Sequence, residues 1–274
     1  MSSESSRLAA RLAGTQGLGV EELVLLNVVE MGPQIGFASD GFERMVAWRR
    51  DAEASLRELR EQVQAAGIRC RCRLELGKPS LEILRVAEEE RVALIAMGSH
   101  AHGPMRRLLR RSVTGAVVGG ADCPVLVVPF PAGKRLETEG GVLAARLFRR
   151  VLLATDFSDA AEGALGVVKG VPAGEVGEVV VLFVGDGRPG PRNPPRDRMD
   201  RIAAELRYFG FTVTCEAQRG KLTSAVAEVL RVHDVSLVVI ASGSGRRPGG
   251  PRAARVAGAV RRASDRPVLI VPAE

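Results

Sequence analysis

The chain has 274 residues, of which 46% are hydrophobic and 26% charged, which is ordinary for one or two globular domains. No apolar run approaches the roughly 18 residues that a membrane-spanning helix needs, and no secretory signal opens the chain, so we expect a cytoplasmic protein without membrane insertion. The net charge of +7 comes mostly from arginine, but one Trp and one Tyr leave few base-stacking platforms, which disfavours a nucleic-acid partner.

The cysteines and histidines predict neither a disulfide nor a metal site. Cys70 and Cys72 lie two apart in a strand-like run and face the same side, where cysteines rarely bond, and no second motif completes a zinc set. His100 and His102 share a loop that offers no third Cys, Asp or Glu ligand. We therefore expect reduced, structural cysteines and no bound metal.

Apolar strands and helical segments alternate along the first half of the chain. In chain order, we expect a helix over residues 3–13, a strand over 23–29, a long amphipathic helix over 43–66, a strand over 70–75, a helix over 81–90, a strand over 93–97, a helix from about 111 to 119 and a strand over 125–128. A Gly-containing loop, residues 98–103, follows the strand 93–97. Strand, Gly-rich turn and helix is an order in which backbone N–H groups can hold phosphate.

The second half of the chain repeats the first. Three landmarks return 143 positions further on (215 − 72, for example), namely Cys72 as Cys215, Gly77 as Gly220 and Pro124 as Pro267. A fixed offset over this much sequence indicates two copies of one module. In the second copy we expect strands over 151–155, 179–184, 212–216, 236–241 and 268–271, and helices over 159–169, 199–208, 222–232 and 253–263.

This alternation predicts an α/β fold of two tandem, doubly wound, parallel sheets, each built on a five-stranded plan. The expected division is a first domain over residues 1–130, a linker over 131–148 and a second domain over 149–274. In the second copy the first strand ends at Asp156, and Ser158 is a candidate N-cap for the next helix. Asp156 thus falls at the carboxyl edge of the sheet, where ligands of such folds bind.

The first copy lacks its N-terminal strand, because Met1 stands where Asp156 stands in the second copy. Its absence should leave two half-sheets with a gap between them. Three explanations are open: the true start lies upstream in frame, the apolar run 142–148 fills the slot, or the two halves close up in an altered sheet. We favour a truncated or misassigned start.

Residues 94–129 carry a motif more specific than strand, turn and helix. The stretch resembles the nucleotide-loop signature of the universal stress protein family, G-x2-G-x9-G-[ST], followed by a last strand that reads CPVLVV. The matching positions are Gly98, Ser112, Val113, Thr114 and residues 123–128, whereas Ala101 and Arg111 replace two of the glycines. Through the internal repeat, the resemblance covers nearly the whole chain in tandem.

The resemblance implies ATP, with Mg²⁺, as the ligand. In the first copy Val28 would pack on the base, and the phosphates would lie against Gly98, Ser99, His100, Ser112, Val113 and Thr114. In the second copy Asp156 would meet the adenine end, with Val184, Gly243 and Gly245 around the nucleotide, while Arg255 and Ala257 replace the two hydroxyl residues. This assignment takes Gly243 as the counterpart of Gly98, which makes the second loop the shorter one.

The resemblance also implies partners. In the family, dimers pair through the last strand, so the strands 125–128 and 268–271 are expected to pair within this chain as an internal pseudo-dimer. A homodimer and an unknown protein partner are further expectations. Free edges this rich in valine would otherwise associate.

For function, the sequence lacks a nucleophile with a base, a Walker lysine and a carboxylate pair at hydrolase spacing, so we do not expect an enzyme. The family resemblance indicates a stress-response binding or regulatory module with degenerate ATP binding. Two alternatives stay open, a slow nucleotide hydrolase and a basic partner-binding protein whose nucleotide sites have decayed.

Overall fold

The computed structural model describes residues 21–30, 41–65, 67–99, 113–129, 147–172, 176–185, 196–242, 258, 260, 264 and 266–273. The first copy contributes β1 (Glu22–Val29), α2 (Gly41–Ala65), β2 (Arg69–Leu76), α3 (Pro79–Glu89), β3 (Ile95–Ser99), α4 (Val113–Gly120) and β4 (Val125–Pro129). The second contributes β5 (Arg150–Thr155), α7 (Asp159–Lys169), β6 (Glu178–Gly185), α8 (Arg196–Tyr208), β7 (Thr212–Arg219), α9 (Leu222–Val232), β8 (Leu237–Ala241) and β9 (Val268–Val271). These elements confirm the predicted ones to within a few residues. The predicted helix 3–13 and most of 253–263 lie outside the described residues.

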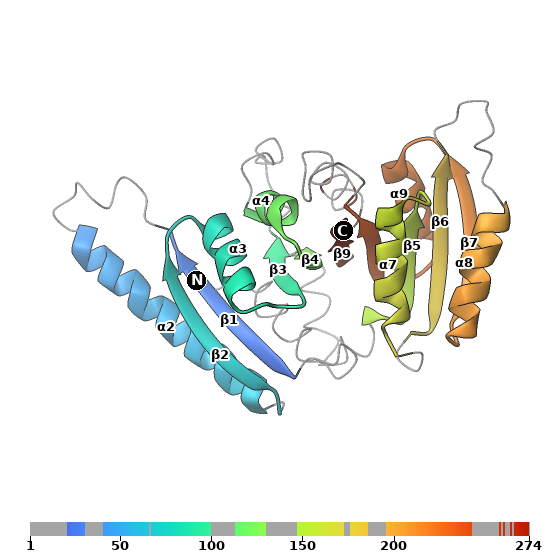
Figure 1. Cartoon of the computed structure of the whole chain (residues 1–274). Helices are drawn as coiled ribbons and strands as arrows, with labels where there is room; N and C mark the ends of the chain where they lie inside the picture. Colours follow the sequence, from blue (N-terminus) through green and yellow to red (C-terminus); the bar gives the residue numbers. More distant parts are fainter. Residues whose placement is uncertain are drawn as a thin grey trace.

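The second copy forms a complete five-stranded parallel sheet in the order β9-β8-β5-β6-β7. Four of its strands, β5, β6, β8 and β9, are rich in Val, Leu and Ile and are largely buried on both faces, as a parallel sheet covered by helices requires, whereas the edge strand β7 is partly exposed. Figure 1 shows α7, α8 and α9 packed around these strands. The predicted doubly wound α/β fold is therefore confirmed.

The strands of the first copy are divided between two sheets. β1 and β2 pair in parallel as a separate two-stranded sheet, whereas β3 and β4 pair in parallel at the end of the large sheet. Within the described residues no strand lies between β1 and β3, so the predicted pair of half-sheets is confirmed and the halves do not close up. Of the apolar run 142–148, Leu147 and Phe148 are described, and both are buried in the core beside β5 rather than paired in a strand.

The two copies are joined into one seven-stranded sheet by their last strands. β4 and β9 pair antiparallel, with Leu126 opposite Leu269 and Val127 opposite Val268. The sequence prediction that these strands pair within the chain is confirmed. Both strands are fully buried, which removes the valine-rich edges that each copy would otherwise expose.

The strand ladders repeat with residue-level precision. Glu22 pairs with Arg69 in the first copy as Glu178 pairs with Thr212 in the second, and both ladders run for eight residues. Likewise Ile95 pairs with Val125 as Val238 pairs with Val268. The module is thus duplicated in its hydrogen-bonding register as well as in its sequence.

Three clusters of buried apolar side chains hold the molecule together. Two lie on opposite faces of the seven-stranded sheet, because neighbouring residues of a strand point to opposite faces, as Leu152 and Leu153 do. The third is small and lies between the two-stranded sheet and α2, whose Leu56, Leu59 and Val63 follow helical spacing. The β1–β2 unit therefore has a core of its own. α2 runs along the outer face of the unit and covers this core (Figure 1).

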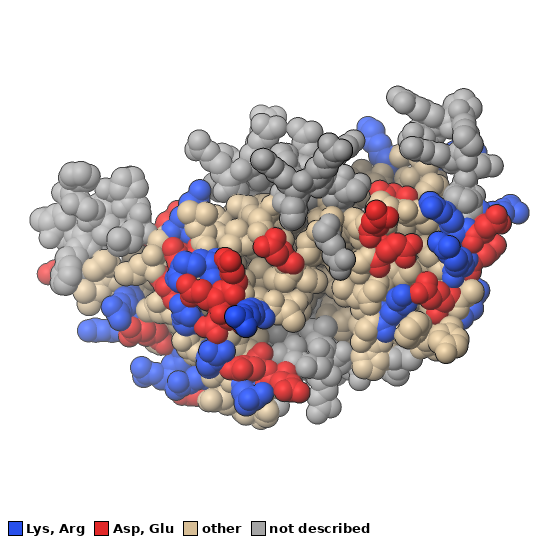
Figure 2. All heavy atoms as spheres, in the orientation of Figure 1, with Lys and Arg blue, Asp and Glu red and all other residues tan. Residues whose placement is uncertain are grey.

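Ion pairs and one close helix contact attach the β1–β2 unit to the rest of the first copy. Arg73 on β2 contacts Glu75 and Glu90 at 2.7 and 2.9 Å, and Arg85 on α3 reaches Glu75 at 2.6 Å. The close helix contact joins α3 to α4. Gly120 of α4 leaves room for Leu84 of α3, since a Cβ on Gly120 would lie 2.7 Å from the Leu84 Cδ1. Figure 2 shows positive and negative side chains interleaved over this region rather than gathered by sign.

Candidate functional site

The second copy contains a topological switch point at the carboxyl edge of its sheet. From β5 the chain passes to β6 and β7 on one side and then to β8 and β9 on the other. The carboxyl ends of β5 and β8 are therefore neighbours from which the following segments diverge, and ligands of open α/β sheets bind in such a crevice. Asp156 follows β5 at this edge, and Ser242 follows β8.

Asp156 is exposed and held in one orientation by the start of α7. Its Oδ1 accepts hydrogen bonds from the backbone N–H of Ser158 at 3.0 Å and from the Ser158 hydroxyl at 2.5 Å. The Ser158 Oγ in turn accepts from the N–H of Ala161, which confirms the predicted N-cap. A carboxylate is favourable beside a helix N-terminus, so the local structure fixes a negative group at the switch point.

Phe157 links this turn to β6 and α8, and the sequence reasoning missed it. Its φ of 59° lies in the left-handed region, which a residue with a bulky side chain rarely adopts. The Phe157 ring stacks on Phe183 at 4.9 Å, and the guanidinium of Arg198 lies 5.6 Å from the Phe157 ring centroid. The sequence shows an aromatic residue between Asp156 and Ser158, but it does not show the left-handed backbone conformation of that residue.

Val184 lies at the same edge as Asp156. Thr155 is opposite Phe183 in the β5–β6 ladder, so the next residue of each strand brings Asp156 beside Val184. Val184 is partly buried against the core on one face of the sheet. Two of the predicted second-copy residues therefore come together, whereas Gly243 and Gly245 lie outside the described residues.

The predicted first-copy residues do not share one sheet. Val28 lies on β1 in the two-stranded sheet, while Gly98 and Ser99 end β3 in the seven-stranded sheet. Val113 and Thr114 open α4, and Val113 packs against the same core as β3. The described residues thus place Val28, predicted to pack on the base, and the start of the predicted phosphate loop on separate sheets. His100 and Ser112 lie outside the described part of the chain.

The strand registers correct one correspondence between the copies. Gly98 pairs with Val128 as Ala241 pairs with Val271, so Ala241 is the counterpart of Gly98. The counterpart of Gly243 is then His100, and the assignment of Gly243 to the Gly98 position is wrong by two residues. It was wrong because small residues follow both strands and a two-residue slip preserves which side chains share a face. With the correct register the two loops are equally long.

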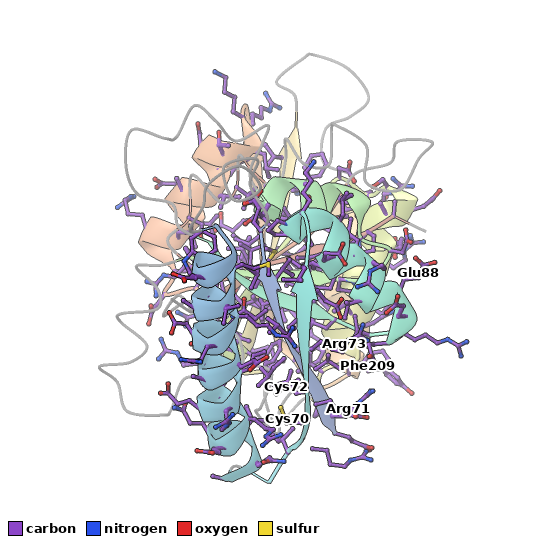
Figure 3. The ribbon with its side chains drawn as sticks, turned by 90° about the vertical axis from the view of Figure 1, so that its left-hand side faces the viewer. Cys70, Arg71, Cys72, Arg73, Glu88 and Phe209 are labelled. Atoms are coloured by element: carbon purple, nitrogen blue, oxygen red, sulfur yellow. The ribbon has the colours of Figure 1, made fainter. Side chains whose placement is uncertain are left out.

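The cysteines are free thiols on partly covered surfaces. Figure 3 shows Cys70 and Cys72 on β2 beside α2, and the Cys72 Sγ lies 3.7 Å from the carbonyl oxygen of Leu56. Burial, followed by the neighbouring Cys72, raises the pKa of Cys70 to about 11. The Cys70 thiol is therefore protonated at neutral pH, which makes it a poor nucleophile and metal ligand.

The described part of the chain contains no cluster of three or more His, Cys, Asp or Glu side chains that could hold a metal ion. None of the described helices is long and apolar enough to cross a bilayer.

Fold and site together define a tandem, doubly wound α/β protein with a topological switch point between β5 and β8. The universal stress protein family model matches residues 2–129. A universal stress protein of Methanocaldococcus jannaschii is 28% identical over 112 residues, which is 40% of this chain and 66% of that protein. A second relative, a universal stress protein of Synechocystis sp., is 31% identical over 132 residues, which is 47% of this chain and 80% of that protein.

Among solved structures, a universal stress protein from Archaeoglobus fulgidus superposes on 99% of this chain and 93% of its own with a TM-score of 0.77, at 24% sequence identity. At this identity the likeness supports the fold, and it extends over both copies. The chain belongs to the universal stress protein family. The resemblance that the sequence indicated is therefore confirmed.

Proposed function

We propose that this chain is a stress-response regulatory module that binds one ATP, with Mg²⁺, in its second copy. The observation that carries the proposal is the complete switch point between β5 and β8, with the oriented carboxylate of Asp156 at its edge. A carboxylate can accept hydrogen bonds from the amino group of a base or from ribose hydroxyls. Val184, next to Asp156 on the neighbouring strand, supplies an apolar surface for the base.

The second copy is favoured over the first because only there do the described residues form an uninterrupted sheet across the switch point. In the first copy Val28 and Gly98 lie on different sheets, so a nucleotide that contacts both has no preformed frame. A preformed site avoids the cost of ordering its parts when the ligand binds. The first-copy residues Ser99, His100, Ser112 and Thr114 then belong to a weaker or lost site.

Binding rather than turnover fits the same residues. The Asp156 carboxylate already accepts two hydrogen bonds from Ser158, which orients it and uses part of the acceptor capacity that a general base would need. The ligand would report a cellular state instead of being consumed. The alternatives, a slow hydrolase and a partner-binding protein with decayed sites, predict Mg²⁺-dependent phosphate release and no ATP binding, respectively.

Calorimetric titration of ATP with Mg²⁺ tests the proposal. We expect about one ATP per chain, and a loss of at least ~10-fold in affinity in Asp156→Ala, the size expected for a hydrogen bond to a charged group. The double variant Ser112→Ala, Thr114→Ala should bind as the unaltered chain does. Asp159→Ala is the matched control, because it removes an equal charge from the first turn of α7 but leaves the Asp156 carboxylate at the switch point in place.

The possible outcomes distinguish the proposed second-copy site from a first-copy site and from the two alternative functions. Binding that the double variant loses and Asp156→Ala keeps would move the site to the first copy, and no binding at millimolar ATP would leave the partner-binding alternative. A phosphate-release assay identifies the hydrolase. We also propose a cytoplasmic location, a protein partner and a homodimer. The proposed first domain ends at residue 130, and the proposed linker ends at residue 148.

A further inference from the structure

The turn that carries Asp156 is held by hydrogen bonds between residues two positions apart. The Phe157 N–H donates to the hydroxyl oxygen of buried Thr155 at 3.0 Å. The Ser158 N–H donates to Asp156 Oδ1 at 3.0 Å, and the Ser158 hydroxyl donates to the same oxygen at 2.5 Å. Because Phe157 is the one residue between the carboxylate and both of its donors, the backbone angles of Phe157 set whether these hydrogen bonds can form.

The backbone of Phe157 is unusual among the described residues. Its φ of 59° lies in the left-handed region, where the only other described residue besides glycine is Arg91, with a φ of 48°. Arg91 directly follows the C-cap of α3, and the ends of helices commonly hold a left-handed residue. Phe157 instead precedes a helix, and a bulky side chain disfavours this backbone conformation. Contacts made by Phe157 must therefore compensate for it.

The ring of Phe157 makes such contacts with two elements that are distant in the chain. It stacks on Phe183 of β6, with 4.9 Å between the ring centroids and 22° between the ring planes. The guanidinium of Arg198, in the first turn of α8, lies 5.6 Å from the centroid of the Phe157 ring. Phe183 is buried at the end of the β5–β6 ladder, opposite Thr155. The ring therefore ties the turn after β5 to both β6 and α8.

The ring lies on the opposite side of the sheet from Val184. Phe157 packs against the buried cluster that contains Leu153, whereas Val184 packs against the cluster on the other face of the sheet. A base packed on Val184 would therefore not lie on the Phe157 ring. An effect of Phe157 on the ligand has to pass through the backbone of the turn and the carboxylate of Asp156.

We propose that Phe157 is a positioning residue for Asp156. Its ring contacts with Phe183 and Arg198 hold the left-handed backbone. That backbone places the N–H and hydroxyl of Ser158 against the Asp156 carboxylate. The role of Phe157 toward ATP rests on the proposed function, whereas the orientation of the carboxylate is a property of the free chain. A carboxylate oriented in advance lowers the cost of ordering it when a ligand binds.

Hydrogen exchange at the Ser158 amide tests the positioning role without a ligand. Phe157→Leu removes the ring contacts but keeps an apolar side chain, and protection of this amide should fall by about 10-fold or more, the size of one hydrogen bond to a charged group. Phe157→Tyr keeps the ring and should retain the protection. Phe211→Leu is the matched control, because Phe211 is buried in the same core cluster but precedes β7, at the amino edge of the sheet. It should lower overall stability and leave the Ser158 amide protected.

Titration with ATP tests whether the orientation of the carboxylate serves the ligand. Phe157→Leu should lower ATP affinity by about 5-fold or more, and Phe211→Leu should not change it. In the background of Asp156→Ala, Phe157→Leu should cause no further loss, because a residue that acts through the carboxylate then has nothing to orient. An equal further loss would mean that Phe157 acts on the ligand by another route, and it would overturn the proposal.

The two measurements separate a failure of the positioning role from a failure of ATP binding. If the chain binds no ATP, the proposed function fails, and protection of the Ser158 amide alone decides whether Phe157 positions the carboxylate. Unchanged protection in Phe157→Leu would overturn the positioning role. An ATP affinity that Asp156→Ala loses and Phe157→Leu keeps would overturn it as well.

If Phe157→Leu fails to fold, Arg198→Ala decides, because the side chain of Arg198 is exposed and can be removed without opening the core. Loss of this cation–π contact should lower protection of the Ser158 amide by about 2-fold or more. Arg201→Ala removes another exposed arginine from the same helix and should leave the protection unchanged. Equal protection in the two arginine variants would contradict the role of the ring contacts.

Discussion

The β1–β2 and β6–β7 ladders have the same length, direction and register, and both begin at a glutamate, Glu22 or Glu178. They differ in what lies beside them. β6 has β5 on its other side and is almost wholly buried, whereas β1 has no second neighbour within the described residues and stays half exposed. Pairing between two strands is therefore specified locally, but burial depends on the strands beyond them.

The ends of these ladders show the same difference. A Cβ on Gly177, just before β6, would lie 2.6 Å from the carbonyl oxygen of Arg149, because β5 begins beside it. The position that corresponds to Gly177 in the first copy is Glu21, which has an exposed side chain. Glycine is needed where a neighbouring backbone approaches closely, and a long side chain is tolerated where none does.

The largest expected effect comes from truncating the same leucine in both copies. Leu182→Ala should lower the free energy of unfolding by about 3–4 kcal/mol, because it opens a cavity in a fully buried site. Leu26→Ala should cost about 1 kcal/mol, since part of that side chain already contacts water. Urea unfolding monitored by circular dichroism measures both. Equal losses would show that β1 is as enclosed as β6.

A smaller effect is expected at the start of β6. Gly177→Ala should destabilise the chain by about 1–3 kcal/mol, because β5 and β6 must separate to admit the methyl group. Glu21→Ala, the matched change in the first copy, should stay within about 0.5 kcal/mol of the unaltered chain. Thermal unfolding of the two variants tests this contrast. A tolerated Gly177→Ala would mean that the strand ends are loosely packed.

The smallest effect is the acid sensitivity of the β2–α3 attachment. Hydrogen bonding from Arg73 holds the pKa of Glu75 below its usual 4.5, and Arg85 does the same for Glu89. Because the folded-state pKa values are depressed, the stabilisation is complete at neutral pH and is lost as the pH falls through them. Both carboxylates are near water, so the effect should be modest.

Hydrogen exchange at β2 and β7 between pH 7 and pH 3 measures this effect. Protection should fall with acid at β2 more than at β7, and Glu75→Gln should remove most of the difference. Glu61→Gln on the exposed face of α2 is the control and should change neither strand. Parallel losses at β2 and β7 would contradict a specific role for the ion pairs.

The sequence alone was sufficient to predict the helices and strands and the duplication of the module. The helix predicted over 159–169 is α7, residue for residue, because Ser158 and the helical spacing of Ala160, Ala164 and Val168 are local signals. The pairing of β4 with β9 was also predicted, because the family resemblance implied pairing through the last strands and because free edges this rich in valine would otherwise associate. For the candidate site, Asp156 follows β5 at the carboxyl edge as predicted, and Val184 lies beside it, while the role of both toward a ligand stays a prediction.

Other features depended on contacts between distant segments. Nothing local to Gly98 or Gly243 distinguishes a register from its two-residue slip. The 143-residue offset of the flanking landmarks points to Ala241 as the counterpart of Gly98, and the ladders with β4 and β9 establish it. The ring of Phe157, whose backbone is left-handed, contacts Phe183 on β6 and Arg198 on α8, and both residues are distant from it in the sequence.

By itself, the sequence determined which segments become strands and helices and that they form two copies of one α/β module, because hydrophobic period, caps and turns act over a few residues. Only the tertiary structure decided among the alternatives that the sequence left open for the first copy: among the described residues the two half-sheets stay apart, and Leu147 and Phe148 pack in the core instead of forming a strand. That outcome depends on which strand edges find partners, and such pairings join residues more than a hundred positions apart, such as Leu126 and Leu269.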